Sequence, residues 1–179
     1  MRTHNRHSLS HPIAVNTPDF SAIINSPLGK LGISINAEHL ICGIRFVDEN
    51  IPLFVEPTIK NHLAFIALTR YFSGSCLEFS LPYQLAGTPF QQRVWQTLFT
   101  TVPTGQTITY QELADLLQSG PRAVANACRH NPLPIIIPCH RVVAKNGLGG
   151  YSGENTEGKF IRIKRWLLQH ENGTAPISH

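Results

Sequence analysis

Short β-rich runs and one helical pattern make up the first half of the chain. The runs "GISI" and "LICGIRFV", between Ile33 and Val47, are separated by the polar stretch from Asn36 to His39, which predicts a hairpin of two strands. Apolar residues recur at helical spacing from about Ile59 to Phe72, so a helix is expected there. The alternating run "CLEFSL" predicts a further strand. We therefore expect a small α/β unit with no evident chemistry.

Helix-start signals dominate the second half. Thr88 and Gln91 form a capping-box pattern, with a proline between them at the favoured first helical position. A second capping box, Thr109 with Glu112, opens another helix, and "PRAVANACRHNP" from Pro121 predicts a third. The last two helices, joined by a Ser-Gly-Pro turn, have the outline of a helix-turn-helix.

The two faces of this third helix differ in character. One face has Val124, Ala127 and Cys128 at helical spacing, and these side chains can pack inward. The opposite stripe is small in its middle and cationic at both ends, which would allow close approach to a phosphate backbone. It consists of Arg122, Ala125, Asn126 and Arg129. An ordinary helical hairpin has the same outline, so this feature alone leaves DNA binding and a purely structural role both open.

Charge and composition narrow the class of protein. The 179 residues carry a formal charge of +4, and basic residues outnumber acidic ones only after Thr88. This favours a polyanionic partner, although a solvated basic surface would have the same composition. The four cysteines form no C-x-x-C pair, and no apolar run is long enough for a signal peptide or a membrane span. We expect a cytoplasmic protein without disulfides, and no metal site among the histidines of the polar segment 1–19.

A cysteine and a histidine stand together at the end of an apolar run. Residues Ile135 to Ile137 read as a buried strand that Pro138 must end, because proline cannot donate to a sheet ladder. This places Cys139 at the rim of the core, followed by His140 and Arg141. A thiol of ordinary pKa needs an imidazole or cationic neighbours to ionise near neutrality. Alternatively, Cys139 is an inert buried residue, as we expect for Cys42, Cys76 and Cys128.

These residues and the segments around them resemble the O6-alkylguanine-DNA alkyltransferase family. The resemblance runs from about Ser26 to Glu171, and its specific centre is "NPLPIIIPCHRVV". It also includes "SPLGKLGISI", "GTPFQQRVW", "VPTGQTITYQELA", "RAVANACRHNP", "GYSG" and "KRWLLQHE", in the family's order. It implies a two-part α/β fold: a small N-terminal α/β domain with an antiparallel, ribonuclease H-like sheet over residues 20–86, and a mostly helical C-terminal alkyltransferase domain with the helix-turn-helix over residues 87–173. Residues 1–19 and 174–179 would be tails.

The resemblance also implies roles for individual residues. Cys139 would accept the alkyl group, His140 would act through a water as its base, and Glu171 would orient the imidazole. Asn131 would brace the turn that holds the cysteine, and Tyr110 would contact the phosphate beside the lesion and protonate the departing guanine. The DNA-binding helix would contribute Arg122, which fills the gap left by the extruded base, with Ala123, Ala125, Asn126 and Arg129. Tyr151, Ser152 and Pro134 would line the substrate pocket.

The implied reaction is a single-turnover DNA repair. An alkyl group on O6 of guanine, or on O4 of thymine, would pass irreversibly to Cys139 from a nucleotide flipped out of double-stranded DNA. No cofactor, metal or membrane is implied, and the protein would act as a monomer. The segment between Tyr151 and Trp166 is longer than the family's by several residues, whereas that between Tyr110 and Arg122 is about two residues shorter. The longer segment is expected to reshape the lip of the pocket.

Three other functions remain to be compared with this one. A non-catalytic lesion-binding relative would replace the acceptor cysteine, which is present here. A cysteine hydrolase could use Cys139, His140 and Glu171, but would turn over repeatedly and need an oxyanion hole, which no motif announces. A DNA-binding regulator is supported only by the helix-turn-helix outline.

Overall fold

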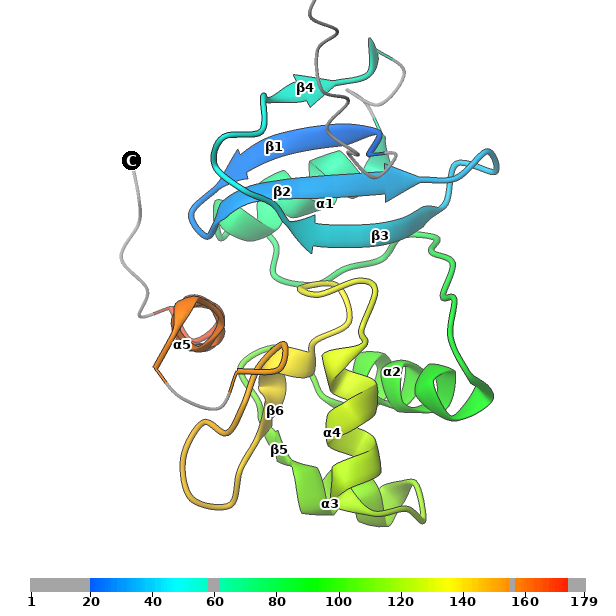
Figure 1. Ribbon diagram of the computed structural model, residues 1–179, viewed down its shortest axis with the longest axis vertical. Helices are drawn as coiled ribbons and strands as arrows, with labels where there is room; N and C mark the ends of the chain where they lie inside the picture. The colour runs from blue at the N-terminus through cyan, green and yellow to red at the C-terminus, as the bar shows by residue number, and fades with distance from the viewer. Residues whose placement is uncertain (1–19, 58–61, 155–156, 174–179) are drawn as a thin grey trace, which may run out of the picture.

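An antiparallel sheet forms the first layer of the molecule. The computed structural model describes residues 20–57, 62–154 and 157–173. Strands β1 (Ala22–Ser26), β2 (Gly29–Ile35), β3 (Ile41–Phe46) and β4 (Phe54–Val55) lie in the order β3-β2-β1-β4 (Figure 1). Every adjacent pair of these strands is antiparallel. The predicted hairpin is confirmed, and its turn is closed by Asn36, whose side-chain oxygen accepts the backbone N–H groups of Glu38 and Leu40.

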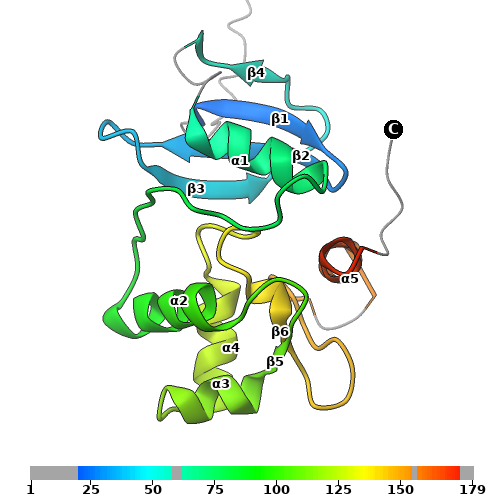
Figure 2. The same cartoon turned by 180° about the vertical axis from the view of Figure 1, so that it is seen from behind.

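Helix α1 (Leu63–Phe72) covers one face of this sheet, as the two opposite views show (Figures 1 and 2). Its N-cap is His62, whose Nδ1 accepts the backbone N–H of Ala64 at 3.1 Å. The helix is confirmed from Leu63 onward, whereas the expected first residues 59–61 lie outside the described residues. Its buried side chains include Tyr71, which points away from the sheet layer toward the second half of the chain.

The run "CLEFSL" is not a strand, so this prediction was wrong. Alternate side chains do turn inward: Leu77 and Phe79 are half-buried and Leu81 is buried. The backbone nevertheless has no ladder partner, and the one bridge nearby joins Ile41 to Tyr83. Alternating polarity indicates that one side of an extended chain is buried, but it does not determine whether a neighbouring strand is present to pair with it.

Helices form most of the second half, and the predicted starts are confirmed. Both capping boxes are present, at the start of α2 (Pro89–Thr101) and of α3 (Tyr110–Leu116). The third helix is α4 (Pro121–Arg129), which packs against α2 and α3. A short parallel pair, β5 (Ile108–Thr109) and β6 (Val142–Val143), lies beside α3, and α5 (Lys159–Glu171) closes the described chain. The expected two-part α/β architecture is therefore present.

Residues Ile135 to Ile137 are buried as expected, but they form a turn rather than a strand. The N–H of Ile137 donates to the carbonyl of Leu133 at 2.8 Å, and Ile135 has a left-handed φ of 79°. A run of isoleucines predicts burial equally well for a strand and for a compact turn, and the tertiary structure selected the turn. After Pro138, residues Cys139–Arg141 form a 3-10 turn, η2.

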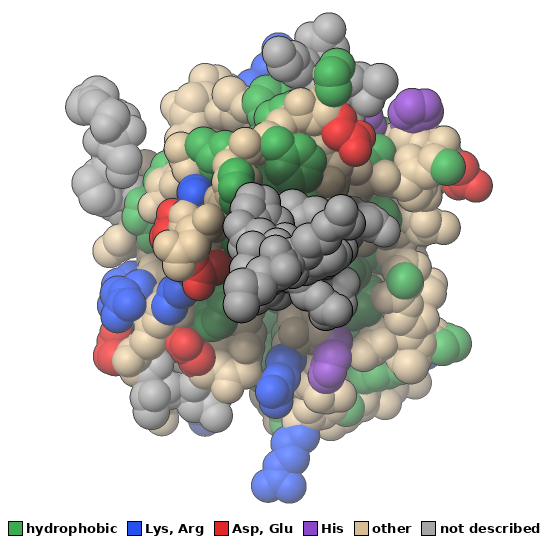
Figure 3. Space-filling view, turned by 45° about the horizontal axis from the view of Figure 1, so that its top comes forward, with side chains coloured by type: hydrophobic (Ala, Val, Ile, Leu, Met, Phe, Trp, Pro, Cys, Tyr) green, Lys and Arg blue, Asp and Glu red, His purple; other side chains and the backbone are tan. Residues whose placement is uncertain are grey.

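The two halves share one hydrophobic core. Its buried side chains come from the sheet, from α1 and from the helices of the second half. A backbone hydrogen bond of 2.9 Å from Ile44 in β3 to the carbonyl of Pro132 joins the sheet edge to the turn before Cys139. On the face shown in Figure 3, the basic side chains at the left lie near acidic ones, whereas those at the bottom lie beside a histidine. Among the described helices, none combines the length and the apolar character needed to cross a membrane.

Candidate active site

Cys139 stands at the start of η2, held from one side by Asn131. The amide of Asn131 donates to the Cys139 sulfur at 3.0 Å and to the carbonyl of Ile137 at 2.8 Å. The oxygen of the same amide accepts the backbone N–H of Leu133 at 3.0 Å. One side chain at the end of α4 therefore ties together both arms of the turn that presents the cysteine, the bracing position expected for Asn131.

The thiol of Cys139 is buried in this resting site. Only 4% of the residue is exposed, and burial raises the pKa of the thiol. The hydrogen bond from Asn131, the adjacent hydroxyl of Tyr151 and the charge of Lys164 lower the pKa in part. Burial outweighs these contacts, so the resting site favours the thiol over the thiolate.

His140 and Glu171 form a buried pair behind the cysteine. His140 Nε2 lies 2.7 Å from Glu171 Oε1, so a neutral imidazole carries its proton at Nε2 and has a lone pair at Nδ1. Nδ1 is buried and has no hydrogen-bond partner among the described residues. Burial, assisted by the charges of Arg141 and Lys164, lowers the pKa of His140 against the opposing effect of Glu171. The imidazole is therefore available as a proton acceptor.

Arg141 completes the pair from the same turn, and sequence reasoning treated it only as a basic residue. Its Nε donates to Glu171 Oε2 at 2.8 Å, and its Nη2 donates to Oε1 at 2.9 Å. Its Nη1 donates to the carbonyl of Val102 at 2.6 Å. Burial alone would raise the pKa of Glu171, but the bonds from His140 and Arg141 hold it well below its usual range. The carboxylate thus stays ionised.

Lys164 is a second group that sequence reasoning missed. Its side chain is buried, and its ammonium donates to three carbonyls, of Val142 at 2.6 Å, Leu148 at 2.6 Å and Gly150 at 3.0 Å. Burial lowers its pKa to about 8. A lysine inside an amphipathic helix is usually solvated, and only the folding of the glycine-rich loop, residues 146–153, over α5 buries this one.

A cavity of about 330 Å³ opens beside the cysteine, a size in the range of small-molecule sites. The side chains around it come from α3, α4, η2 and the glycine-rich loop. They are Tyr110, Ala125, Asn126, Cys128, Arg129, Cys139, Gly150, Tyr151, Ser152 and Gly153. Most of the expected site residues thus meet here, and Cys128, interpreted as a core residue, lines the cavity as well. Pro134, expected in the pocket, is buried in the turn and lies outside this lining.

A tight turn forms one lip of this cavity. The backbone groups of Tyr151 and Glu154 exchange two hydrogen bonds of 2.9 Å, and the residues between them, Ser152 and Gly153, have φ values of 48° and 91°. A Cβ at Gly153 would stand 2.9 Å from the guanidinium of Arg129, which lies against it. Beside this turn, the hydroxyl of Tyr110 donates to the carbonyl of Gly150 at 3.1 Å. Backbone atoms therefore form much of the lip.

The exposed side of α4 lies at the mouth of the cavity. Arg122, Ala123, Asn126 and Arg129 are exposed and Ala125 is half-buried, whereas Val124 and Ala127 are buried, as the sequence pattern predicts. Arg122 and Ala123 do not line the cavity themselves. The helix thus offers an exposed stripe beside an opening that leads to Cys139. Among the described residues, no group of three or more potential ligands could hold a metal ion.

Comparison with known proteins identifies similar sequences and structures. Residues 89–173 match the family model described as 6-O-methylguanine DNA methyltransferase, DNA binding domain. The methylated-DNA–protein-cysteine methyltransferase of Mycobacterium tuberculosis is 46% identical over 165 residues, covering 86% of this chain and 92% of the relative. A probable enzyme of that name from Acanthamoeba polyphaga mimivirus is 38% identical over 153 residues, covering 83% of this chain and 94% of its own.

Solved structures agree with these sequence matches. Mycobacterium tuberculosis OGT in complex with DNA superposes with a TM-score of 0.70 at 37% identity, covering 86% of this chain and 93% of that one. The O6-methylguanine-DNA methyltransferase of Pyrococcus kodakaraensis superposes with a TM-score of 0.63 at 29% identity, covering 79% and 90%. The similarity therefore includes the sheet layer as well as the helical half.

Proposed function

Because this chain belongs to the methylated-DNA–protein-cysteine methyltransferase family, we propose that it repairs DNA by transferring the alkyl group from O6 of guanine to the sulfur of Cys139. The single observation that supports Cys139 as the acceptor is that its thiol borders a cavity and that a buried histidine is the next residue in the chain. The thiol borders a cavity of about 330 Å³, and His140, whose Nδ1 has no partner among the described residues, follows it directly in the chain.

Activation begins from the neutral thiol. The proton of Cys139 passes, through a water, to Nδ1 of His140, while Nε2 stays bonded to Glu171 at 2.7 Å. The ionised Glu171 stabilises the imidazolium that forms. The amide of Asn131 at 3.0 Å and the charge of Lys164 stabilise the thiolate. Holding the thiol neutral until a base occupies the cavity protects it from other electrophiles and oxidants.

Alkyl transfer then exchanges one bond for another. The thiolate attacks the alkyl carbon, a sulfur–carbon bond forms, and the carbon–O6 bond breaks. Tyr110 lies in the cavity wall and supplies a proton to the departing guanine. Burial raises the pKa of this phenol, so it is protonated and able to donate. The thioether product has no ready route to hydrolysis, so each chain repairs one base.

Access to the alkyl carbon requires the nucleotide to leave the duplex. Unstacking costs a few kcal/mol, less for a damaged and poorly paired base. Arg122, exposed on α4, is placed to fill the gap in the stack, and Ala123 and Ala125 allow the helix to lie close to the groove. Asn126 and Arg129 belong to the exposed stripe and also line the cavity. At this position they contact the DNA near the extruded nucleotide.

We further propose that the protein acts as a monomer with two domains, residues 20–86 and 87–173, the first a reduced ribonuclease H-like unit, and that O4-alkylthymine is also a substrate. All the groups that the proposed chemistry uses come from one chain, which supports a monomer. Sedimentation of the protein alone and on a short duplex tests the oligomeric state. A second chain required for activity would reject the monomer.

Intact-mass spectrometry after mixing with a duplex oligonucleotide containing O6-methylguanine tests the proposed function. We expect one added methyl group per chain, located on Cys139. Cys139→Ala should gain none, whereas Cys128→Ala, which removes the other thiol of the cavity, should still be methylated. Repeated turnover with unmodified Cys139 would instead indicate a cysteine hydrolase that uses Cys139, His140 and Glu171.

A further inference from the structure

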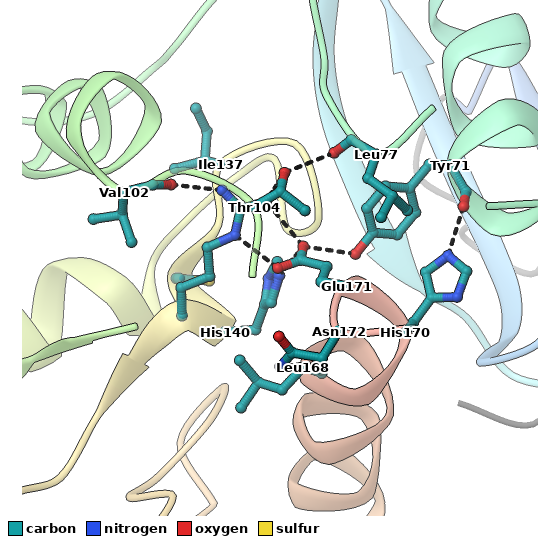
Figure 4. A network of polar contacts seen from close by, with 12 residues as sticks. Tyr71, Leu77, Val102, Thr104, Ile137, His140, Leu168, His170, Glu171 and Asn172 are labelled. Atoms are coloured by element: carbon teal, nitrogen blue, oxygen red, sulfur yellow. Dashed lines mark hydrogen bonds and ion pairs between the residues drawn. The ribbon is translucent and has the colours of Figure 1, made fainter. Parts of the chain in front are cut away.

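One side chain from the sheet half of the molecule enters the polar network behind the cysteine. Tyr71, in the last turn of α1, is fully buried, and its hydroxyl donates to Oε1 of Glu171 at 2.9 Å (Figure 4). The two residues are 100 positions apart in the sequence. Residue Tyr71 also lies outside the matched family model, which begins at residue 89.

The Glu171 carboxylate is held from three directions, and one oxygen receives most of the bonds. Oε1 lies 2.7 Å from His140 Nε2, 2.9 Å from the Tyr71 hydroxyl and 2.9 Å from Arg141 Nη2. Oε2 accepts from Arg141 Nε at 2.8 Å. His140 and Tyr71 therefore share a single acceptor atom, so the presence of one donor affects the strength of the other.

Tyr71 is itself held by the residue adjacent to Glu171. Nε2 of His170 lies 2.6 Å from the Tyr71 carbonyl, and the two rings meet edge to face with centroids 5.2 Å apart. The opposite contact is with Phe79, whose ring stacks on that of Tyr71 at 5.2 Å. The phenol is thus fixed through its backbone, its ring and its hydroxyl, and it has little freedom to turn away from the carboxylate.

We propose that Tyr71 is a positioning residue for alkyl transfer, supplied by the first half of the chain to complete the His140–Glu171 pair. It acts through Glu171 and touches neither the thiol nor the substrate. The inference rests on the proposed function, in which His140 accepts the Cys139 proton. It implies that the helical half alone, residues 87–173, holds an incompletely fixed carboxylate.

The phenol also adjusts how strongly Glu171 attracts the proton on His140. The charged and titratable groups that act on this pair are Tyr71 from α1, Arg141 from η2 and Lys164 from α5. Burial holds the pKa of Tyr71 far above its usual range, so Tyr71 remains a neutral donor. Removing this donor leaves Oε1 a stronger acceptor for His140, which favours the imidazolium and raises the pKa of His140. The imidazole would then be a proton acceptor over a narrower pH range.

The test is the pH profile of single-turnover methylation of Cys139 by duplex DNA, measured for Tyr71→Phe from about pH 5 to 9. We expect the acid limb to move upward by about one pH unit, so the rate falls on the order of tenfold below the limb, with DNA affinity unchanged. Tyr83→Phe is the matched control, because Tyr83 packs on Phe99 outside the network. Its profile should equal that of the wild type.

Failure of this inference is distinguishable from failure of the proposed function. Wild-type protein that gains no methyl group would reject the function itself. Wild-type protein that is methylated, together with a Tyr71→Phe profile superimposable on it, would overturn only the role of Tyr71. If Tyr71→Phe does not fold, fluorotyrosine placed at position 71 provides a second test. Its phenol is a stronger hydrogen-bond donor, so the acid limb should move to lower pH. An unmoved limb in that protein would also overturn the role.

Discussion

The amide of Asn131 donates to the sulfur of Cys139 over 3.0 Å, and it donates to the carbonyl of Ile137 over 2.8 Å. The side chain of Asn131 therefore stabilises the turn and also lowers the pKa of the thiol. A thiolate accepts such a bond more strongly than a thiol does, so the contact favours ionisation at a site where burial opposes it.

Asn131→Ala should therefore weaken both properties. We expect a loss of about 2 kcal/mol in the free energy of unfolding, because two buried acceptors and one N–H lose their partner. The pKa of Cys139 should rise, which slows methylation at neutral pH. Denaturant melts and the pH dependence of thiol alkylation measure the two effects. Asn36→Ala removes a similar turn bond in the exposed hairpin and should leave the thiol unaffected.

Arg122→Ala should separate extrusion of the nucleotide from the chemical step. Methylation by duplex DNA is expected to slow by on the order of tenfold or more, whereas transfer from the free base O6-benzylguanine should change little, since no stack must be opened. Arg45→Ala, on the exposed face of β3, is the control for loss of one positive charge. Equal slowing of both reactions by Arg122→Ala would reject a role in filling the stack.

Acidification should destabilise the protein through His140. Its pKa is lowered in the folded state, so below about pH 6.5 the unfolded chain binds a proton that the folded chain does not. The free energy of unfolding should then fall as the pH falls, by up to about 1.4 kcal/mol per pH unit. Glu171, whose folded pKa is lowered, adds to the loss at more acidic pH.

The assignment to His140 is checked by thermal melts between about pH 5 and 7. His140→Gln should flatten the dependence of Tm on pH, whatever its effect on Tm itself. His130→Gln, which removes an exposed histidine at the end of α4, should keep the wild-type slope. A steep slope that survives in His140→Gln would place the titrating group elsewhere.

Methylation of Cys139 should loosen the fold. The residue is 4% exposed and packed beneath Asn131, so an added carbon must displace a neighbour or occupy the cavity, and overpacking typically costs about 1–3 kcal/mol. We expect a lower Tm for the methylated protein than for the thiol form, measured on the same preparation before and after reaction. An unchanged or higher Tm would show that the cavity accommodates the methyl group without strain.

Local signals in the sequence were sufficient to predict the helices that carry the proposed DNA-binding surface. The capping boxes at Thr88 and Thr109 and the two-faced pattern of Pro121–Arg129 each involve residues within a few positions of one another, and the structure has all three helices there. The Cys–His pair and its apolar lead-in likewise marked the position of the candidate site.

Long-range packing determined the features that local sequence patterns did not predict. "CLEFSL" found no strand to pair with, and the isoleucines before Cys139 closed into a turn, because a polarity pattern specifies burial but no partner. Three features depend on segments brought together from distant parts of the chain: the bond from Tyr71 to Glu171, the burial of Lys164 and the raised pKa of the Cys139 thiol. The sequence by itself identified Cys139, His140 and Glu171 as candidate site residues, whereas the tertiary structure set their pKa values, because these follow burial and contacts that only the folded chain creates.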